Sequence, residues 1–147
     1  MDASGNVTKT YGWKPDGTWG TDPLFMKAEG EYYYYHNDHL GTPQKLTDAD
    51  GATVWSALYT SFGEAQVIPA STVTNNLRFP GQYFDAETGL HYNFHRYYSP
   101  AIASYLTSDP LKGLNPYNYA ENMPYSKKRR LLYHLVFKLA YIFRFWR

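Results

Sequence analysis

The sequence contains no cysteine, and its candidate acid–base side chains include 13 Asp or Glu and 5 His residues. Two carboxylates, Asp85 and Asp109, flank a Tyr-rich stretch, and a hairpin bending near Ser99-Pro100 would place them side by side. Two close carboxylates cannot both ionise cheaply, so they share a proton and divide into a general acid and a general base. Such a pair could activate water for amide hydrolysis. Taken singly, Asp85 also suits the start of a turn and Asp109 the end of a strand.

Histidines form two further groups. His36 and His39 flank Asp38, and His91 and His95 lie four residues apart. A zinc site needs three or four converging ligands, and neither group follows a known ligand spacing. The lack of cysteine also excludes disulfides and thiolate metal sites. We therefore expect structural, hydrogen-bonding histidines, with no metal and no cofactor.

The elements that would position these residues are short strands joined by turns. Asp begins a type I turn well and Gly tolerates positive φ at its end, and this pairing recurs through the chain. It occurs at residues 2–5, 15–18, 48–51 and 85–89. Runs rich in Tyr, Phe, Trp, Val and Thr lie between such turns, at residues 31–36, 53–59 and 90–98. The pattern predicts an all-β fold, an antiparallel meander of β-hairpins.

Tyrosines on both faces of so small a sheet would leave aromatic surface exposed unless another part covers it. The run at residues 32–35 could instead stack on sugar rings, which makes carbohydrate binding an alternative function. Tyr is, however, a favoured strand residue that packs across strands. Residues 1–124 carry a formal charge of −6, so nucleic-acid binding by this part is not expected.

The formal net charge of +1 is a cancellation between two unlike segments. All acids, glycines and prolines lie before residue 125, whereas residues 125–147 hold seven Lys or Arg. Residues 126–147 place apolar side chains at helical spacing, which predicts a basic amphipathic helix. Such a helix would lie on an anionic membrane, fill a partner's groove or pack on the exposed sheet. It is too short and too charged for a transmembrane span.

The order of motifs resembles the Rhs-associated core of bacterial Rhs proteins, and the Asp-x-x-Gly hairpins resemble their tyrosine-aspartate (YD) repeats. The matching segments are residues 33–44, 46–48, 62–63, 77–83, 85–93, 96–100, 108–110 and 113–117. Among them are Asp85-Ala86-Glu87-Thr88-Gly89-Leu90, Arg96-Tyr97-Tyr98-Ser99-Pro100 and Ser108-Asp109-Pro110. The resemblance divides the chain into partial YD-repeat strands at residues 1–31, the Rhs-associated core at 32–124 and the tail at 125–147.

The resemblance implies a hollow β shell that encloses a C-terminal toxin, with the core closing one end. It also implies an aspartyl autoprotease whose two acids correspond to Asp85 and Asp109. Two departures argue against activity here: Phe84 stands where self-cleaving relatives often carry Arg, and the cleavage motif expected after Pro124 is replaced. We therefore expect a structural plug with inactive autoprotease residues.

The resemblance also implies partners and a location. The partners would be the rest of an Rhs shell or another YD-repeat chain, secretion-system components and, through residues 126–147, an anionic membrane. The protein would be bacterial, cytoplasmic before export and then secreted or at the cell surface. Residues 1–6 have neither a basic start nor an apolar run, so a cleaved signal peptide is not expected. The missing cleavage motif predicts a shortened or orphan copy.

Overall fold

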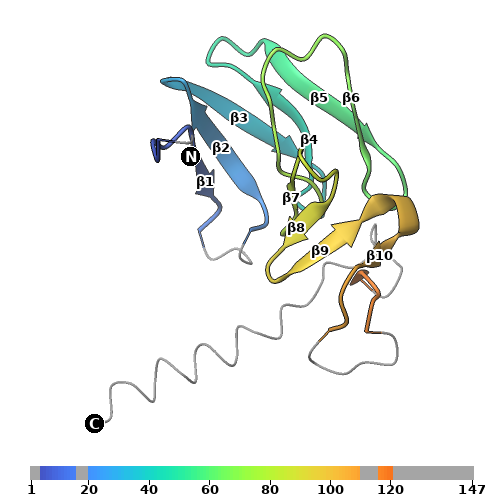
Figure 1. Ribbon diagram of the computed structural model, residues 1–147. Coiled ribbons are helices and arrows are strands. Elements are labelled where there is room, and N and C mark those ends of the chain that lie inside the picture. The colour runs from blue at the N-terminus through green and yellow to red at the C-terminus, as the bar shows by residue number, and fades with distance from the viewer. Residues whose placement is uncertain (1–3, 16–19, 110–115, 121–147) are drawn as a thin grey trace.

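The computed structural model describes residues 4–15, 20–109 and 116–120. Within this part the chain forms two antiparallel sheets and no α-helix; one 3-10 turn, η1, spans Pro100–Ile102 (Figure 1). The strands of the first sheet are β1 (Lys9–Trp13), β2 (Pro23–Ala28), β3 (Glu31–Asn37), β4 (Pro43–Thr47), β5 (Thr53–Tyr59) and β6 (Ala65–Val67). The second sheet contains β7 (Tyr83–Phe84), β8 (His91–Asn93), β9 (Arg96–Ser99) and β10 (Ser104–Tyr105). The predicted all-β, antiparallel fold is confirmed for these residues.

The first sheet is a six-stranded meander in which each strand pairs with the next along the chain. The β4–β5 hairpin shows why the expected Asp-x-x-Gly turn works. Asp48 Oδ1 accepts hydrogen bonds from the amides of Asp50 and Ala52, at 3.0 and 2.8 Å. Gly51 closes the turn with φ of 85°, a left-handed conformation that costs Gly little. The turn is thus set by residues within four positions of one another.

Two further hairpins use the same turn, although the sequence analysis did not assign them. In the β3–β4 turn, Asp38 Oδ1 accepts bonds from the amides of Leu40 and Thr42, at 2.8 and 2.9 Å. In the β5–β6 turn, Thr60 takes the place of Asp, and its hydroxyl accepts a 3.2 Å bond from the amide of Glu64. Asp38 therefore shapes a turn and does not join His36 and His39 in a ligand group.

The second sheet differs from the sequence-based expectation by one turn. Residues 90–98 were expected as a single strand, but β8 and β9 are separate strands that reverse direction at Phe94 and His95. Phe94 has φ of 64°, which sequence gives no reason to expect of a bulky residue. The expected bend near Ser99-Pro100 is present as η1, between β9 and β10.

Each sheet contributes side chains to its own hydrophobic cluster. The cluster of the first sheet contains Met26, Ala28, Leu46, Trp55 and Ala57. The cluster of the second sheet contains Phe79, Tyr98, Tyr105, Tyr119 and Ala120. Tyr59 at the end of β5 packs against both clusters. The two sheets therefore form one continuous interior.

Three of the expected elements involve residues outside the described part: the turns at 2–5 and 15–18 and the helix at 126–147. Within the described part, no helix is long and apolar enough to cross a membrane.

Candidate functional site

Asp85 lies in the exposed turn between β7 and β8 and is held by that turn. Its Oδ1 accepts a 3.0 Å bond from the amide of Glu87, and its Oδ2 accepts a 2.8 Å bond from the hydroxyl of Thr88. These bonds favour the charged form, the one from Thr88 most, and they lower the pKa of the Asp85 carboxyl. Asp85 is therefore an ionised turn residue.

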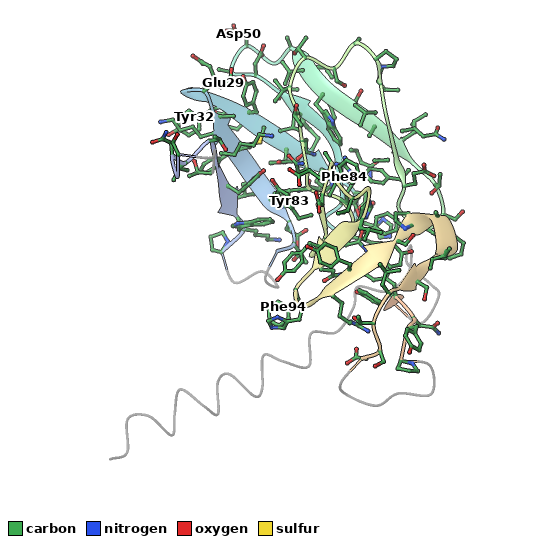
Figure 2. The ribbon with its side chains drawn as sticks, viewed as in Figure 1. Glu29, Tyr32, Asp50, Tyr83, Phe84 and Phe94 are labelled. Carbon is green, nitrogen blue, oxygen red and sulfur yellow. The ribbon has the colours of Figure 1, made fainter. Side chains whose placement is uncertain are left out.

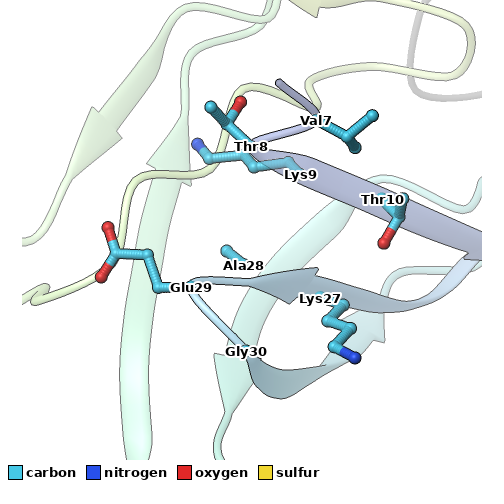
Figure 3. Close-up of a pocket in the computed structure, with 8 residues that line it drawn as sticks. All are labelled: Val7, Thr8, Lys9, Thr10, Lys27, Ala28, Glu29 and Gly30. Atoms are coloured by element: carbon cyan, nitrogen blue, oxygen red, sulfur yellow. The ribbon is translucent and has the colours of Figure 1, made fainter. Parts of the chain in front are cut away.

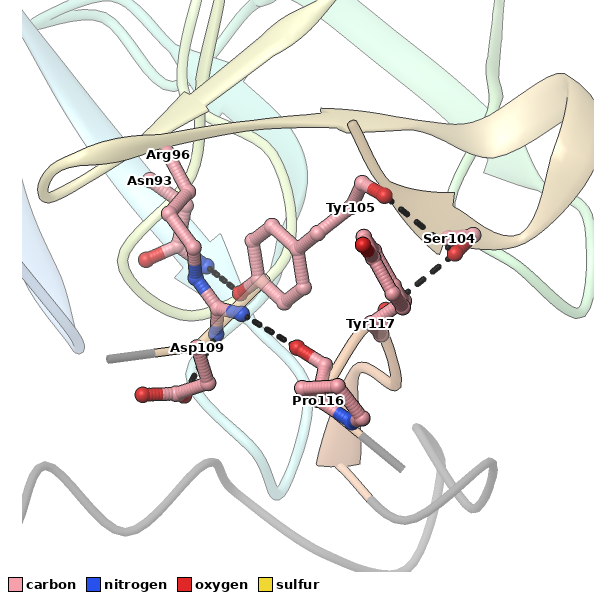
Figure 4. Close-up of polar contacts among 7 residues, drawn as sticks. All are labelled: Asn93, Arg96, Ser104, Tyr105, Asp109, Pro116 and Tyr117. Atoms are coloured by element: carbon pink, nitrogen blue, oxygen red, sulfur yellow. Dashed lines mark hydrogen bonds and ion pairs between the residues drawn. The ribbon is translucent and has the colours of Figure 1, made fainter. Parts of the chain in front are cut away.

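Asp109 lies beside the second sheet and forms an ion pair with Arg96. Arg96 Nη2 is 2.9 Å from Asp109 Oδ2, and Arg96 Nη1 donates a 2.9 Å bond to the carbonyl of Pro116 (Figure 4). The guanidinium also stacks on Tyr105, with Cζ 3.6 Å from the ring centre. The amide of Asp109 donates to the same Pro116 carbonyl at 2.8 Å. One buried arginine thus joins β9, β10 and the segments around Asp109 and Pro116.

The turn at Phe94 places the two aspartates at opposite ends of the second sheet. A single hairpin bending near Ser99 would have returned Asp109 to the level of Asp85. With the extra reversal, Asp85 lies opposite Leu90 at one end, whereas Arg96 pairs with Asn93 at the other. Leu90 and Asn93 are three residues apart, about 10 Å along a strand. The structure therefore holds each aspartate with separate partners.

Arg78, Gln82 and His91 form a buried polar group that no sequence motif marks. Arg78 donates from Nη1 to the carbonyls of Asn75 and Leu77, both at 2.9 Å. His91 Nδ1 lies 2.7 Å from Gln82 Oε1. Burial, with a smaller contribution from the positive charge of Arg78, lowers the pKa of His91 to about 4. His91 is therefore neutral at ordinary pH; only its position in a run of alternating buried residues could have signalled this.

Among the described residues, His36 and His95 belong to different sheets. His36 Nε2 lies 3.2 Å from Thr47 Oγ1 on the outer face of the first sheet, and His95 is exposed in the β8–β9 turn. In the described part of the chain, no group of three or more His, Asp or Glu side chains could hold a metal ion.

A shallow pocket lies at one edge of the first sheet, between β1 and the β2–β3 turn (Figure 3). It is lined by residues 7–10 and 27–30. Lys9 beside it donates to the carbonyl of Thr74 at 2.8 Å and to Asn76 Oδ1 at 3.1 Å. Burial lowers the pKa of Lys9, and the nearby Glu29 partly opposes this. The lysine thus ties β1 to the segment that leads into the second sheet, which is a structural role.

Comparison with protein families matches residues 33–67 to the family described as RHS protein. The chain is 36% identical over 103 residues to the double-stranded DNA deaminase toxin A of Burkholderia cenocepacia, covering 65% of this chain and 7% of the toxin. It is 33% identical over 132 residues to the tRNA nuclease WapA of Bacillus subtilis, covering 84% of this chain and 6% of the nuclease.

Among solved structures, the chain resembles part of the Tc holotoxin pore of Photorhabdus luminescens, determined with an Asp-to-Ala substitution in its TccC3 component. The TM-score is 0.64 with 25% identity, over 85% of this chain and 6% of that one. The chain thus spans less than a tenth of each of these three proteins. The matched residues include the β3–β6 hairpins, with the two Asp-x-x-Gly turns at Asp38 and Asp48 and the related turn at Thr60. This chain belongs to the Rhs family of YD-repeat proteins.

Proposed function

We propose that this chain is a structural β section of an Rhs toxin-delivery protein, closing or plugging its shell. One observation carries the proposal: the same segment occurs in relatives named for a DNA deaminase activity and for a tRNA nuclease activity. A segment shared by proteins with different toxic activities is suited to a task that those proteins have in common. Its partners would be the remaining shell strands, before and after export from a bacterial cell.

The packing of the second sheet supports a plug. Residues 116–120 return to the sheet, where Tyr105 donates its amide to the carbonyl of Tyr117 at 2.9 Å. Tyr119 and Ala120 then complete the aromatic cluster. Residues 116–120, near the end of the proposed core at residues 32–124, are thereby fixed against strands β9 and β10. We assign residues 1–31 to partial repeat strands and 125–147 to a separate tail.

A chimera tests the structural role. Residues 1–124 would replace the matching segment of full-length WapA, and protection of the downstream nuclease segment from added trypsin would be measured. We expect the nuclease segment to stay protected. A matched chimera carrying Trp55→Asp, which places a charge in the first core, should lose protection. Digestion of the nuclease segment in a chimera whose inserted section is folded would contradict the proposal.

We further propose that Asp85 and Asp109 are inactive as an autoprotease. Support comes from their separate partners, the Asp85 turn and Arg96. The chain would be joined to the downstream segment of a relative, including its cleavage motif, and examined for fragments. We expect an intact product. Two fragments that disappear on Asp109→Asn would contradict inactivity while leaving the structural proposal intact.

The carbohydrate alternative has weaker support. Of the run at residues 32–35, Tyr33 and Tyr35 pack on the first core, and Lys27 Nζ lies 5.1 Å from the ring centre of Tyr32. Only Tyr32 and Tyr34 of this run face outward. Retention on a glycan array that is lost with Tyr32→Ser and Tyr34→Ser would favour this alternative.

A further inference from the structure

Three tyrosines and one leucine form an exposed stripe, here called the aromatic stripe, on one face of the second sheet: Tyr83, Tyr92, Tyr97 and Leu106. At one end of the stripe, the Tyr83 hydroxyl lies near the Tyr11 hydroxyl of β1. Tyr83 pairs with Tyr92 and Tyr92 with Tyr97, so the three rings stand at one level of β7, β8 and β9. Leu106 follows β10 and donates its amide to the carbonyl of Tyr97 at 2.9 Å. Tyr92 and Tyr97 meet edge to face, with ring centres 5.6 Å apart. Figure 2 shows Tyr83 beside Phe84, whose side chain belongs to the opposite face.

The stripe is exposed but small. Tyr83, Tyr92, Tyr97 and Leu106 expose 40%, 39%, 42% and 49% of their surface. Each is therefore more than half covered, and together they fall well short of the ~800 Å² per partner of a standard protein interface. A separate protein would also lose translational and rotational freedom on binding, which so little apolar area cannot offset. A segment tethered to the same chain avoids most of that cost.

Residues 126–147 are such a segment. The last described residue, Ala120, is buried against Tyr98 and Tyr105, on the face of β9 and β10 opposite the stripe. Six residue steps lead from Ala120 to Ser126, so the start of the tail lies within about 22 Å of Ala120. Its sequence supplies Leu132, Val136, Leu139 and Phe143 at the spacing of one helix face.

Charge favours the same pairing. Residues 125–147 carry seven Lys or Arg and no acid, whereas residues 1–124 have a formal charge of −6. Two acids, Asp85 and Glu87, lie in the exposed turn at one end of the second sheet. We propose that the aromatic stripe is the docking site for residues 126–147 of the same chain, which cover it with their apolar side chains.

Hydrogen exchange measured by mass spectrometry on the full chain tests this proposal. We expect amides of residues 131–143 to exchange about tenfold faster in the Tyr92→Ser/Tyr97→Ser variant than in the unmodified protein. The matched control is Tyr32→Ser/Tyr34→Ser, because those tyrosines are 44% and 46% exposed on the first sheet. This control should leave tail exchange unchanged. Equal tail exchange in the unmodified protein and the stripe variant, or equal acceleration in both variants, would overturn the proposal.

A reciprocal change guards against an indirect effect of the stripe substitutions. Leu132→Asp/Leu139→Asp in the tail should speed exchange of the β8–β9 hairpin while leaving β2–β3 unchanged. Sedimentation with phosphatidylglycerol vesicles separates docking from membrane attachment. We expect the stripe variant to bind vesicles more than the unmodified protein, because its tail is released. Equal vesicle binding by the two proteins would show that the tail does not dock on the stripe.

Discussion

The two sheets of this protein are stabilised in different ways. The first packs apolar side chains such as Met26, Leu46 and Trp55, all at most 1% exposed. The second packs tyrosines whose hydroxyls form hydrogen bonds inside the fold. Tyr98 donates to the carbonyl of Phe62 at 3.0 Å, and Tyr105 accepts a 2.9 Å bond from Asn93 Nδ2. The cluster of the first sheet depends on apolar side chains that fill its space. The cluster of the second sheet depends on hydroxyl groups that must keep their hydrogen-bond partners.

The two sheets also differ in how far apart in the sequence their contacting residues lie. In the first sheet every strand pairs with its neighbour in the chain, across turns that are complete within a few residues. The second sheet depends on segments outside its strands, including Arg78, Gln82, Asp109 and Pro116. The first sheet should therefore be destabilised most by substitutions that remove apolar packing. The second sheet should be destabilised most by substitutions that remove polar contacts and by a change of pH.

The largest expected effect is on the first sheet. Trp55→Ala removes the largest side chain of its core and should lower the free energy of unfolding by about 4 kcal/mol. Urea denaturation followed by circular dichroism measures this loss. The matched control is Leu58→Ala on the same strand, where the side chain is 64% exposed, and it should stay within about 0.5 kcal/mol of the unmodified protein. Similar losses in both variants would contradict the assigned core.

Acid should act on the second sheet through His91. Its pKa is lowered in the fold to about 4 from a usual value of 6.5, first by burial and then by Arg78. Between these values the unfolded chain binds a proton that the folded chain does not, so stability falls with falling pH. We expect a loss of about 3 kcal/mol between pH 7 and 4, measured by urea denaturation.

The glutamine of the His91→Gln variant keeps a polar side chain opposite Gln82 and does not titrate. The stability of this variant should therefore depend less on pH between 6.5 and 4.5 than that of the unmodified protein, although it should be lower at pH 7. The pKa of Asp85 is lowered in the fold, so the stabilising effect of its charge is lost only at pH values below the usual carboxyl pKa. The titration of Asp85 therefore does not contribute to the pH dependence assigned to His91. Equal pH slopes in both proteins would assign the acid sensitivity to other groups.

The sequence was sufficient to predict turns whose conformation is set by residues a few positions apart. The turn at Asp48 was predicted because a short acceptor and a Gly with positive φ lie within four residues. The same reasoning could have found the turn at Asp38, but that residue was considered only with the neighbouring histidines. The turn at Thr60 has a weaker signal, because a hydroxyl replaces the carboxylate.

The sequence did not predict features whose structure depends on chain segments far apart in the sequence. Nothing in the residue types marks Phe94 as a turn, and this one reversal moves Asp109 to the end of the sheet opposite Asp85. Arg78 and Arg96 carry charged side chains, a type seldom fully buried in proteins, yet both are buried here, at 5% exposure each. Their partners are carbonyls and a carboxylate supplied by chain segments whose positions depend on the whole fold. The assignment of Asp85 and Asp109 as inactive autoprotease residues stays a prediction.

Arg96 offers a way to weaken the second sheet alone. Arg96→Met removes the ion pair with Asp109 and the bond to the Pro116 carbonyl, and it should cost about 2 kcal/mol, since Asp109 stays partly solvated. Arg96→Lys keeps the charge but not the two-pronged geometry, and it should recover less than half of the loss. Hydrogen exchange should quicken in β9 and β10 and not in β2 and β3. Uniform quickening across both sheets would mean that they unfold together.

The smallest expected effect tests what the two sheets share. Gly51 in the β4–β5 turn and Gly89 in the β7–β8 turn have φ of 85° and 72°, and a side-chain carbon at either would meet no atom within 4 Å. Ala at each position therefore adds only backbone strain, about 1 kcal/mol. Urea denaturation of Gly51→Ala and Gly89→Ala should give equal losses if both hairpins are part of one cooperative unit. A loss at Gly51 with none at Gly89 would show that the β7–β8 hairpin opens independently, because strain in a hairpin that is already open does not change the main transition.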